Sequence, residues 1–227
     1  MRIIHNKKLV FLANPKTGTT SIRDILNDYS DVISTNKFPY YHHISACELK
    51  YVFKQKKWKW SNYRIICTVR NPWERAISNY FYAKPDKNFR PFYNSNYDID
   101  SRFSHDINSW INYVLRNESY TTREYFFNDK KSNIPFVLRS LHLLIPIKWF
   151  CYEGDQLLVN DIIKLEDLNG KLLPILQSIG INITDGIPRK NVSDKKITKL
   201  NKDSIELIGD RFKDEINWFN YKPYPSL

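Results

Sequence analysis

The sequence predicts an α/β domain with three layers, in which a mostly parallel central sheet is covered by helices on both faces. Two strand–loop–helix units carry this prediction. Each joins a short apolar run, residues 9–14 or 64–69, to a segment whose apolar side chains have helical spacing. Successive units of this kind are typical of parallel sheets with helices packed on them. The 227 residues suffice for one sizeable core and contain no obvious linker, so we expect a single domain over 1–227.

The first unit runs from the buried strand LVFLAN, residues 9–14, through the loop PKTGTT to a helix over 21–30. The apolar side chains of this helix share one face, at Ile22, Ile25, Leu26 and Tyr29. The second unit starts with the strand RIICTV, residues 64–69. Pro72 then occupies a first-turn position where proline is tolerated. The apolar face of the helix that follows is expected at Trp73, Ile77, Tyr80 and Phe81.

The remaining elements follow the same logic. Residues 83–104 are rich in Asn, Asp, Pro, Tyr and Ser and predict a long surface loop or lid. Ser104 can then cap a helix whose apolar face is Ile107, Trp110, Ile111 and Val114. Residues 146–165 are interpreted as a hairpin turning at 153–155, followed by a third buried strand, DIIKL.

Two helices are expected in the C-terminal third. One spans Leu168 to Ile179 and ends at Gly180, because glycine is favoured just past a helix. A polar segment over 185–202 separates it from a last helix over 204–219. The stripe expected on that last helix is Ile205, Ile208, Phe212, Ile216 and Phe219.

Charge and cysteine content narrow the classes of function. The 35 Lys and Arg exceed the 24 Asp and Glu, giving +11, which indicates an anionic partner such as nucleic acid, an acidic surface or polymer, or a phosphorylated small molecule. No stretch approaches 18 apolar residues and no signal peptide is evident. The cysteines, Cys47, Cys67 and Cys151, are too dispersed for a disulfide framework or zinc site. We therefore expect a cytoplasmic protein without a membrane span or bound metal.

The loop over 14–21, NPKTGTTS, carries the clearest chemistry. It opens a helix, whose first turn has unpaired N–H groups and partial positive charge, and so suits a phosphate. Gly18 allows close backbone approach, and Lys16 adds a mobile cation. Hydroxyl donors are available at Thr17, Thr19, Thr20 and Ser21. The loop differs from the nucleoside-triphosphate pattern GxxxxGK[ST], and no strand ends in an acidic residue that would hold magnesium, which disfavours a kinase or a triphosphate hydrolase.

A second phosphate-suited segment is RNPWERAISNY, residues 70–80. Arg70 follows a strand at its carboxyl end, where open α/β sheets bind ligands. Ser78 lies about two turns into the next helix, and an arginine fork with a hydroxyl can hold a second phosphate. Arg75, in contrast, is more simply interpreted as one half of an ion pair with Glu74 or another acid.

Together these motifs resemble those of the sulfotransferases that use 3'-phosphoadenosine 5'-phosphosulfate (PAPS), in the branch with bacterial and carbohydrate enzymes. PKTGTTS resembles the family's P-loop-like 5'-phosphosulfate loop, and RNPWERAISNY its 3'-phosphate motif, RNPxxRxxSxY. HHISACELK, NDIIKLEDLNGKLLPILQSIGI and PRKNVSDKK resemble three later segments. The resemblance covers nearly the whole chain except 83–135, which we interpret as an insertion or lid on the acceptor side.

The resemblance implies transfer of a sulfuryl group from PAPS to an acceptor hydroxyl, expected on a carbohydrate. Lys16 would neutralise the leaving oxygen, and a base would take the acceptor's proton. His43 matches the family position best, His42 is its neighbour, and Glu74 and Glu166 are acidic alternatives. No metal is required. The residues Lys190, Asn191 and Ser193 are expected to close over the 3'-phosphate.

Two other classes of function stay open from the sequence. A basic nucleic-acid-binding protein would explain the charge of +11 but has no use for PKTGTTS, so we expect no nucleic-acid partner. A nucleotide-binding module without turnover would keep the phosphate loops, but Lys16 and His43 disfavour it. The sequence does not identify the acceptor or the oligomeric state.

Overall fold

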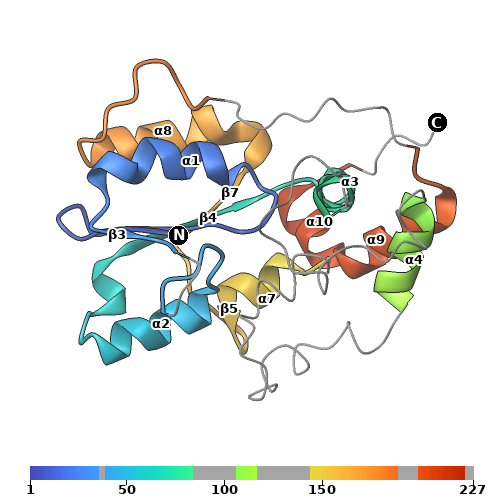
Figure 1. The fold of residues 1–227 in the computed structure, drawn as a ribbon, viewed down its shortest axis with the longest axis horizontal. Helices are drawn as coiled ribbons and strands as arrows, with labels where there is room; N and C mark the ends of the chain where they lie inside the picture. The colour runs from blue at the N-terminus through green and yellow to red at the C-terminus, as the bar shows by residue number, and fades with distance from the viewer. Residues whose placement is uncertain (36–38, 84–105, 117–143, 189–198, 223–227) are drawn as a thin grey trace. The chain divides into compact units, whose positions relative to one another are not determined.

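The computed structural model describes residues 1–35, 39–83, 106–116, 144–188 and 199–222 (Figure 1). They belong to two compact units. The first unit comprises Met1–Arg70 and Ile147–Asp194, and the second comprises Asn71–Pro146 and Lys195–Leu227. The expectation of a single domain over 1–227 stays a prediction.

The first unit is built on a five-stranded sheet of order β3-β1-β2-β4-β7. β2 is parallel to β4 and β4 to β7, whereas β1 is antiparallel to both β2 and β3. Four of these five strands therefore point the same way, which confirms the predicted mostly parallel sheet. The strands are β1 (Arg2–Ile4), β2 (Leu9–Leu12), β3 (Val32–Ile33), β4 (Arg64–Val69) and β7 (Asp161–Lys164).

The strand register brings several chain segments to one edge of this sheet. Leu12 pairs with Cys67, and Val69 pairs with Lys164, so β2, β4 and β7 end side by side. Arg2, at the start of the antiparallel β1, pairs with Phe11 near the end of β2. We call this side of the sheet the carboxyl edge. The loop after β2 and Arg70 after β4 both leave the sheet there.

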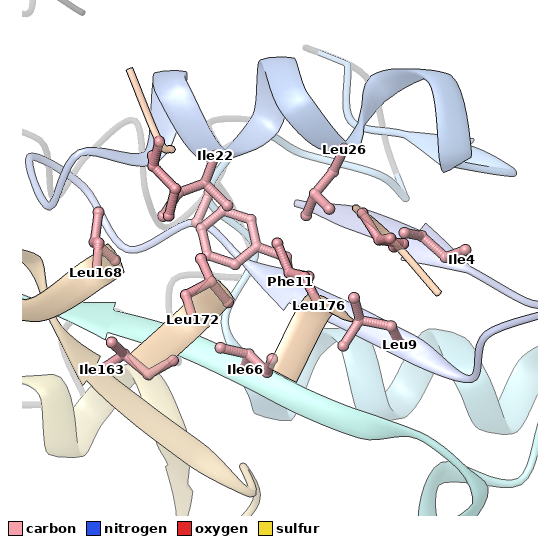
Figure 2. Close-up of a cluster of buried hydrophobic side chains, with 13 residues drawn as sticks. Ile4, Leu9, Phe11, Ile22, Leu26, Ile66, Ile163, Leu168, Leu172 and Leu176 are labelled. Carbon is pink, nitrogen blue, oxygen red and sulfur yellow. The ribbon is translucent and has the colours of Figure 1, made fainter. Parts of the chain in front are cut away.

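Helices cover both faces of the sheet, as predicted. α1 (Thr19–Leu26) and α8 (Leu168–Ser178) lie on one face and α2 (Ala46–Gln55) on the other (Figure 1). Figure 2 shows the core beneath α1 and α8, where side chains from both helices meet those of the sheet. Its buried members include Ile4, Leu9, Phe11, Ile22, Leu26, Ile66, Ile163, Leu168, Leu172 and Leu176.

The helix after β2 is shorter than predicted. α1 ends at Leu26, and a 3₁₀ turn over Asn27–Tyr29 follows it. Ile22 and Leu26 are buried as expected, but Tyr29 is 38% exposed. Because the turn departs from the α-helical period, Tyr29 does not continue the buried face, and its predicted inward orientation is wrong.

On the opposite face, α2 begins with a capping box. Ser45 Oγ accepts a hydrogen bond from the Glu48 backbone N–H, and the Glu48 carboxylate accepts one from the Ser45 N–H. Phe53, fully buried, meets the rings of Trp58, Trp60 and Tyr63 edge-on at 5.0–5.3 Å between centroids. These aromatic side chains therefore form core on this face.

The segment before β7 matches its prediction in part. The expected hairpin is formed by β5 (Tyr152–Glu153) and β6 (Gln156–Leu157), with Gly154 at a φ of 59° in the turn. Residues before it form a helix instead, α7 (Ile147–Cys151). The helix α8 and its terminal Gly180, at a φ of 77°, are found where they were predicted.

The described part of the second unit contains α3 (Pro72–Ala83), α4 (Ile107–Arg116), α9 (Lys202–Arg211) and α10 (Lys213–Phe219). Pro72 opens α3 as predicted, while Phe81 on the expected apolar face is 40% exposed. The four apolar residues predicted for α4 are all buried. Asp106 accepts hydrogen bonds from the N–H groups of Asn108 and Ser109 and so caps α4. Ser104, the predicted cap, lies outside the described residues, as do 84–104 of the predicted loop.

The prediction of a single last helix is wrong. Phe212, with φ of −110° and ψ of 22°, breaks it into α9 and α10. The break turns Glu215 into the interior, where it is 1% exposed, in place of a continuous apolar stripe. In the part of the chain that the structure describes, no helix is both long enough and apolar enough to cross a membrane.

Candidate functional site

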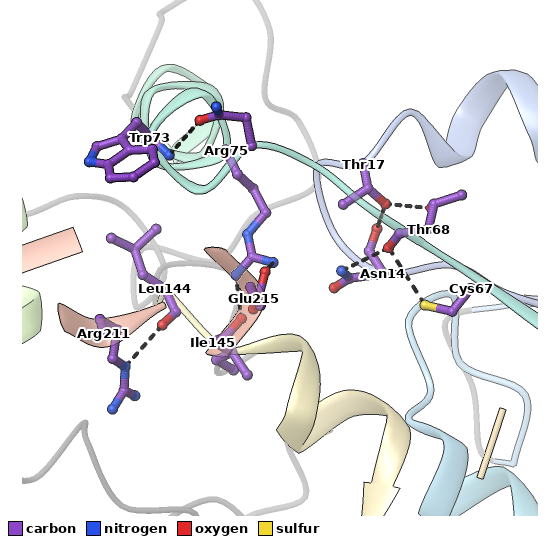
Figure 3. Close-up of polar contacts among 11 residues, drawn as sticks. Asn14, Thr17, Cys67, Thr68, Trp73, Arg75, Leu144, Ile145, Arg211 and Glu215 are labelled. Atoms are coloured by element: carbon purple, nitrogen blue, oxygen red, sulfur yellow. Dashed lines mark hydrogen bonds and ion pairs between the residues drawn. The ribbon is translucent and has the colours of Figure 1, made fainter. Parts of the chain in front are cut away.

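The loop after β2 is tied to the end of the neighbouring strand. Asn14 Nδ2 donates to the Thr68 carbonyl at 3.1 Å. Thr17 Oγ1 donates to the Asn14 carbonyl at 2.8 Å and lies 2.7 Å from Thr68 Oγ1 (Figure 3). Since Thr68 comes two residues before Arg70, these bonds fix the loop at the carboxyl edge beside that arginine's strand.

Two loop residues have a left-handed backbone. Lys16 has a φ of 62° and Gly18 a φ of 74°. Glycine adopts this conformation without cost, and a Cβ on Gly18 would also lie only 2.4 Å from Leu165 Cδ1. Lysine adopts this conformation rarely. Residues with such an unfavourable backbone occur most often where a loop binds a ligand. Glycine is therefore favoured at position 18 by its positive φ, and any larger residue would also require Leu165 to shift.

The first turn of α1 supplies anion-binding groups. Gly18 is its N-cap residue, so no side chain caps the helix. The first-turn N–H groups of a helix and the positive end of its dipole point toward its N-terminal side, which here carries the loop that contains Lys16. Thr19 and Ser21 are buried, whereas Thr20 is partly exposed.

The structure revises the expected role of Thr17. The sequence suggested a hydroxyl donor for a phosphate, but this side chain is fully buried and its proton goes to the Asn14 carbonyl. Its remaining contact is with Thr68. Thr17 can therefore serve an anion only through its backbone N–H, while its side chain holds the loop in place.

His43 lies against the end of β2. Its Nδ1 is 2.6 Å from the Ala13 carbonyl, which can only accept, so Nδ1 carries the proton. Burial lowers the pKa of His43 to about 3, and the charge of Arg23 acts in the same direction, against the opposing effect of the Ala13 hydrogen bond. The imidazole is thus neutral near pH 7, with a lone pair on Nε2, as a general base requires.

His42 has the opposite tautomer. Its Nδ1 is 3.1 Å from Arg23 Nη1 and 2.9 Å from Ser34 Oγ. Guanidinium nitrogen can only donate, so His42 Nδ1 accepts and the proton lies on Nε2. Burial and then Arg23 lower its pKa to about 4. A neutral His42 therefore offers a donor where His43 offers an acceptor.

The residues of the RNPWERAISNY segment fall in both units. Arg70, partly exposed, directly follows β4 in the first unit. Ser78, also partly exposed, lies on α3 in the second unit. Lys190, Asn191 and Ser193 lie outside the described residues, so their predicted roles stay predictions.

Arg75 pairs with an acid, as the sequence analysis favoured. Its Nη1 is 3.6 Å from Glu215 Oε2, and both side chains are almost fully buried (Figure 3). Arg75 Nη2 also donates to the Ile145 carbonyl, and the guanidinium lies over the Phe212 ring, 4.8 Å from its centroid. Arg75 therefore has a structural role in the second unit.

Sequence reasoning missed several residues around the loop. Thr68 was not distinguished from other strand residues, and the Ala13 carbonyl has no sequence signature. Arg23 belongs to the amphipathic helix that was predicted, and its position one turn from Thr19 could have indicated that it faces the carboxyl edge. Among the described residues, no group of three or more His, Cys, Asp and Glu side chains is placed to hold a metal ion.

Comparison with known proteins identifies the family. The sequence pattern of the Sulfotransferase family matches residues 1–222. A solved structure of the mouse sulfotransferase SULT7A1 complexed with PAP is 14% identical, with a TM-score of 0.36 over 81% of this chain and 62% of that one. This chain thus spans less than two thirds of that protein. No curated protein matches the sequence. Since the family match covers nearly the whole chain, the protein belongs to the sulfotransferase family, which confirms the resemblance.

Proposed function

We propose that the protein transfers the sulfuryl group of PAPS to an acceptor hydroxyl, with a carbohydrate as the acceptor. One observation carries this proposal. An uncapped helix N-terminus and Lys16 lie on the loop after β2, and the neutral His43 is hydrogen-bonded to the last residue before that loop. The family match and the PAP named with the mouse sulfotransferase support the same reaction. A cytoplasmic location stays a prediction from the sequence.

The loop at 16–21 would hold the 5'-phosphosulfate end of PAPS. Backbone N–H groups of the first turn of α1 would donate to its oxygens, and Gly18 would let them approach closely. Lys16 would supply a full positive charge. Thr20, partly exposed, is the loop hydroxyl most open to such a ligand, since Thr17 bonds to Asn14.

Arg70 and Ser78 would bind the 3'-phosphate. For Arg70 this proposal rests on its position after β4, next to the strand that leads into the phosphosulfate loop. For Ser78 it rests on the motif RNPxxRxxSxY alone. Lys190, Asn191 and Ser193 are proposed to close over the same phosphate on sequence grounds.

PAPS supplies an activated sulfuryl group on a good leaving group. His43 Nε2 would take the proton of the acceptor hydroxyl as its oxygen forms a bond to sulfur. As the bond from sulfur to the 5'-phosphate oxygen breaks, Lys16 would stabilise the negative charge that remains there. Nδ1–H stays on the Ala13 carbonyl and keeps the imidazole oriented. The products would be a sulfate ester and adenosine 3',5'-bisphosphate (PAP).

His43 is the better base because His42 Nδ1 is occupied by two partners and its Nε2 carries the proton. Glu166 and Glu74 stay as acidic alternatives from the sequence. Substitution of each histidine in turn would separate their roles.

The test is transfer of labelled sulfate from PAPS to a panel of neutral and acidic glycans and small alcohols. Appearance of both a labelled ester and PAP is expected. PAP binding without release of sulfate to any acceptor would favour a nucleotide-binding module. Tight, salt-dependent binding of DNA or RNA without PAP binding would favour a nucleic-acid-binding protein instead.

The nucleotide assignment has its own test, with PAP and adenosine 5'-phosphate as ligands. We expect Arg70→Ala to weaken PAP binding at least 10-fold and adenosine 5'-phosphate binding little, because a charge-assisted hydrogen bond is worth about 1.5–3 kcal/mol. Titration calorimetry with both ligands measures this. Equal weakening of the two ligands would remove Arg70 from the 3'-phosphate site.

A further inference from the structure

Lysines gather at the edge of the sheet opposite the carboxyl edge. β2 and β4 begin there side by side, since Leu9 pairs with Arg64. Residues 49–64, which run from α2 into β4, contain five lysines and one arginine but no Asp or Glu. Charges of one sign repel one another in the folded protein, whereas interspersed charges of both signs do not. This segment therefore carries a one-sided charge that its own residues do not balance.

The fold adds Lys8, from the turn between β1 and β2, to this edge. The Arg64 N–H donates to the Lys8 carbonyl at 2.8 Å, and Lys8 Nζ lies over the Tyr63 ring, 5.1 Å from its centroid. Tyr63 meets Phe53, in the last turn of α2, at 5.0 Å between ring centroids. The turn, the end of α2 and the start of β4 therefore meet in one place. We call the exposed lysines gathered there the lysine patch, whose members are Lys8, Lys54, Lys56, Lys57 and Lys59.

The lysine patch has no counter-charge within the part of the chain that the structure describes, where none of its members forms an ion pair. Two acids at this end of the sheet are already engaged. Asp161 accepts hydrogen bonds from the Arg64 guanidinium at 2.7 and 2.9 Å, and Asp31 accepts one from the His5 N–H at 2.5 Å. An anion from outside the chain can therefore supply the missing counter-charge.

Two members of the patch hold a backbone conformation that lysine rarely adopts. Lys57, just past α2, has a φ of 57°, and Lys8 has a φ of 51°. Glycine or asparagine is favoured at such positions. Lys54 also complements the negative end of the α2 dipole, but Lys8 and Lys59 lie outside that helix. Stability of α2 alone therefore does not account for the patch.

Two tryptophans lie among these lysines. Trp58 and Trp60 meet the Phe53 ring edge-on at 5.3 and 5.0 Å, and Trp60 Nε1 donates to the Leu158 carbonyl at 3.1 Å. Each is held in place on its inner side and is partly exposed at the surface. Tryptophan is favoured at the boundary between lipid head groups and acyl chains, and lysines are attracted to anionic head groups.

We infer that the lysine patch, together with Trp58 and Trp60, docks the protein on a membrane surface that contains anionic lipids. A second copy of this chain is a poor partner, because each copy carries a charge of +11. Nucleic acid is commonly held by arginine as well as lysine, but the guanidinium of Arg64 is engaged by Asp161. The inference does not depend on the proposed function.

Docking in this way leaves the loop at 16–21 open. The six residues of β4 separate the patch from the carboxyl edge by roughly 17 Å, at about 3.3 Å per residue. Ligands of that loop would therefore reach it from the side of the sheet that faces away from the lipid.

The experiment is sedimentation of the full chain with vesicles, either of phosphatidylcholine alone or with about 30% phosphatidylglycerol to give a negative surface. Binding to the anionic vesicles is expected to be at least about 10-fold tighter, and to weaken as salt rises from about 0.1 to about 0.5 M, because salt screens exposed charges. The triple variant Lys56→Gln, Lys57→Gln, Lys59→Gln should bind them about 100-fold more weakly, at about 5-fold for each lysine.

A second triple variant, Lys171→Gln, Lys199→Gln, Lys213→Gln, is the matched control. It removes the same charge from exposed lysines that do not belong to the patch. Its binding to anionic vesicles should stay within a few-fold of wild type. Equal losses in the two triple variants would show that net charge alone attracts the protein, and would overturn the inference. Equal binding of the wild-type protein to neutral and anionic vesicles would overturn it as well.

Two further titrations complete the test. A single-stranded DNA oligomer that binds through the patch, when anionic vesicles do not bind, would assign the surface to nucleic acid and overturn the inference. Calorimetry with PAP should give the patch variant the same affinity as the wild-type protein, and a loss of PAP affinity equal to the loss of vesicle binding would overturn it too. Vesicle binding needs no turnover, so the inference and the proposed function fail separately.

Discussion

Lys16 holds a left-handed backbone with a φ of 62°, a conformation that costs a residue with a side chain about 1–3 kcal/mol. The loop tolerates this because Thr17 and Asn14 fix it to Thr68. The strain places a cation at the first turn of α1, where we propose that the leaving oxygen develops charge. Stability and activity therefore make opposite demands on this position.

This opposition can be measured by substitution of Lys16. Lys16→Ala should lower turnover about 100-fold, because one preorganised charge partner contributes on the order of 3 kcal/mol. Lys16→Gly should be equally inactive but more stable than Lys16→Ala by about 1 kcal/mol, since glycine accepts a positive φ. Sulfate-transfer assays and urea unfolding of both variants check this. Turnover within a few-fold of wild type in either variant would exclude Lys16 as the leaving-group partner.

The base assignment predicts a difference between two adjacent histidines. His43→Ala should lower turnover by about 10²–10⁴, the usual contribution of a positioned base, while PAP affinity stays near wild type. His42→Ala should retain turnover on a neutral acceptor far better. If His42→Ala is the inactive variant, the base is assigned to the wrong neighbour.

The pH profile gives an independent readout of His43. Its low pKa, near 3, keeps the free protein's base neutral through the acid range, so kcat/KM should fall only at strongly acidic pH. Bound PAPS is negatively charged and favours the imidazolium, so the ascending limb of kcat should lie at higher pH than that of kcat/KM. The limb should be absent in His43→Ala. If the ascending limbs of kcat and kcat/KM coincide, bound nucleotide does not raise the pKa of His43.

Much of the candidate site could be predicted because its residues sit at recognisable places in a strand–loop–helix unit. Lys16, Gly18 and Arg70 follow directly from strand ends and a helix start. The hydroxyl of Thr17 could not be assigned, since its direction depends on Thr68, which belongs to another strand. Glu215, the partner of Arg75, was equally hidden, because the pair joins distant parts of the sequence.

At the scale of elements, the junction of the loop at 16–21 with α1 depends on one glycine. Gly18→Ala should lower the free energy of unfolding by about 2–4 kcal/mol, through a left-handed alanine and overlap with Leu165. Gly154→Ala is the control, as it has a φ of 59° with nothing near its added Cβ, and should cost only about 1–2 kcal/mol. Urea unfolding measures both. Equal losses would show that Leu165 moves aside freely.

A double variant tests the steric part directly. Leu165→Ala should remove the overlap, so its combination with Gly18→Ala should be more stable than the sum of the two single losses predicts. Strict additivity would contradict a contact between Leu165 and the added methyl group.

Element prediction succeeded where periodicity was long and failed where it was short. α4 and α8 were found through their apolar faces, and Gly180 marked the end of the second. β1 and β3, of three and two residues, are too short to show an alternation. The last helix breaks at Phe212, and the break turns Glu215 inward toward Arg75; the apolar stripe in the sequence gave no sign of that pairing.

At the scale of the whole molecule, a sequence charge of +11 makes acid conditions unfavourable, because protonation of carboxylates adds further self-repulsion. The two neutral histidines at the carboxyl edge act in the same direction. His42 and His43 have pKa values lowered by burial to about 4 and about 3, against about 6.5 in an unfolded chain. Between these values the unfolded state binds protons that the folded state does not.

Stability should therefore rise with pH across this window. Folded pKa values below the unfolded ones mean that stability is complete above about pH 6.5 and is lost as pH falls toward 4 and 3, by at most about 1.4 kcal/mol per pH unit for each histidine. Urea unfolding at pH 7.5, 6.5, 5.5 and 5, each about one unit apart or less, measures the slope of the free energy of unfolding against pH.

His43→Asn should reduce this slope, while its amide keeps a donor for the Ala13 carbonyl. The double variant with His42→Asn should reduce the slope further. Carboxylates contribute equally to all three proteins, so the differences between slopes belong to the histidines. A slope that neither substitution changes would show that folding does not lower the pKa of either histidine, so that burial would not be what keeps the proposed base His43 neutral at acid pH.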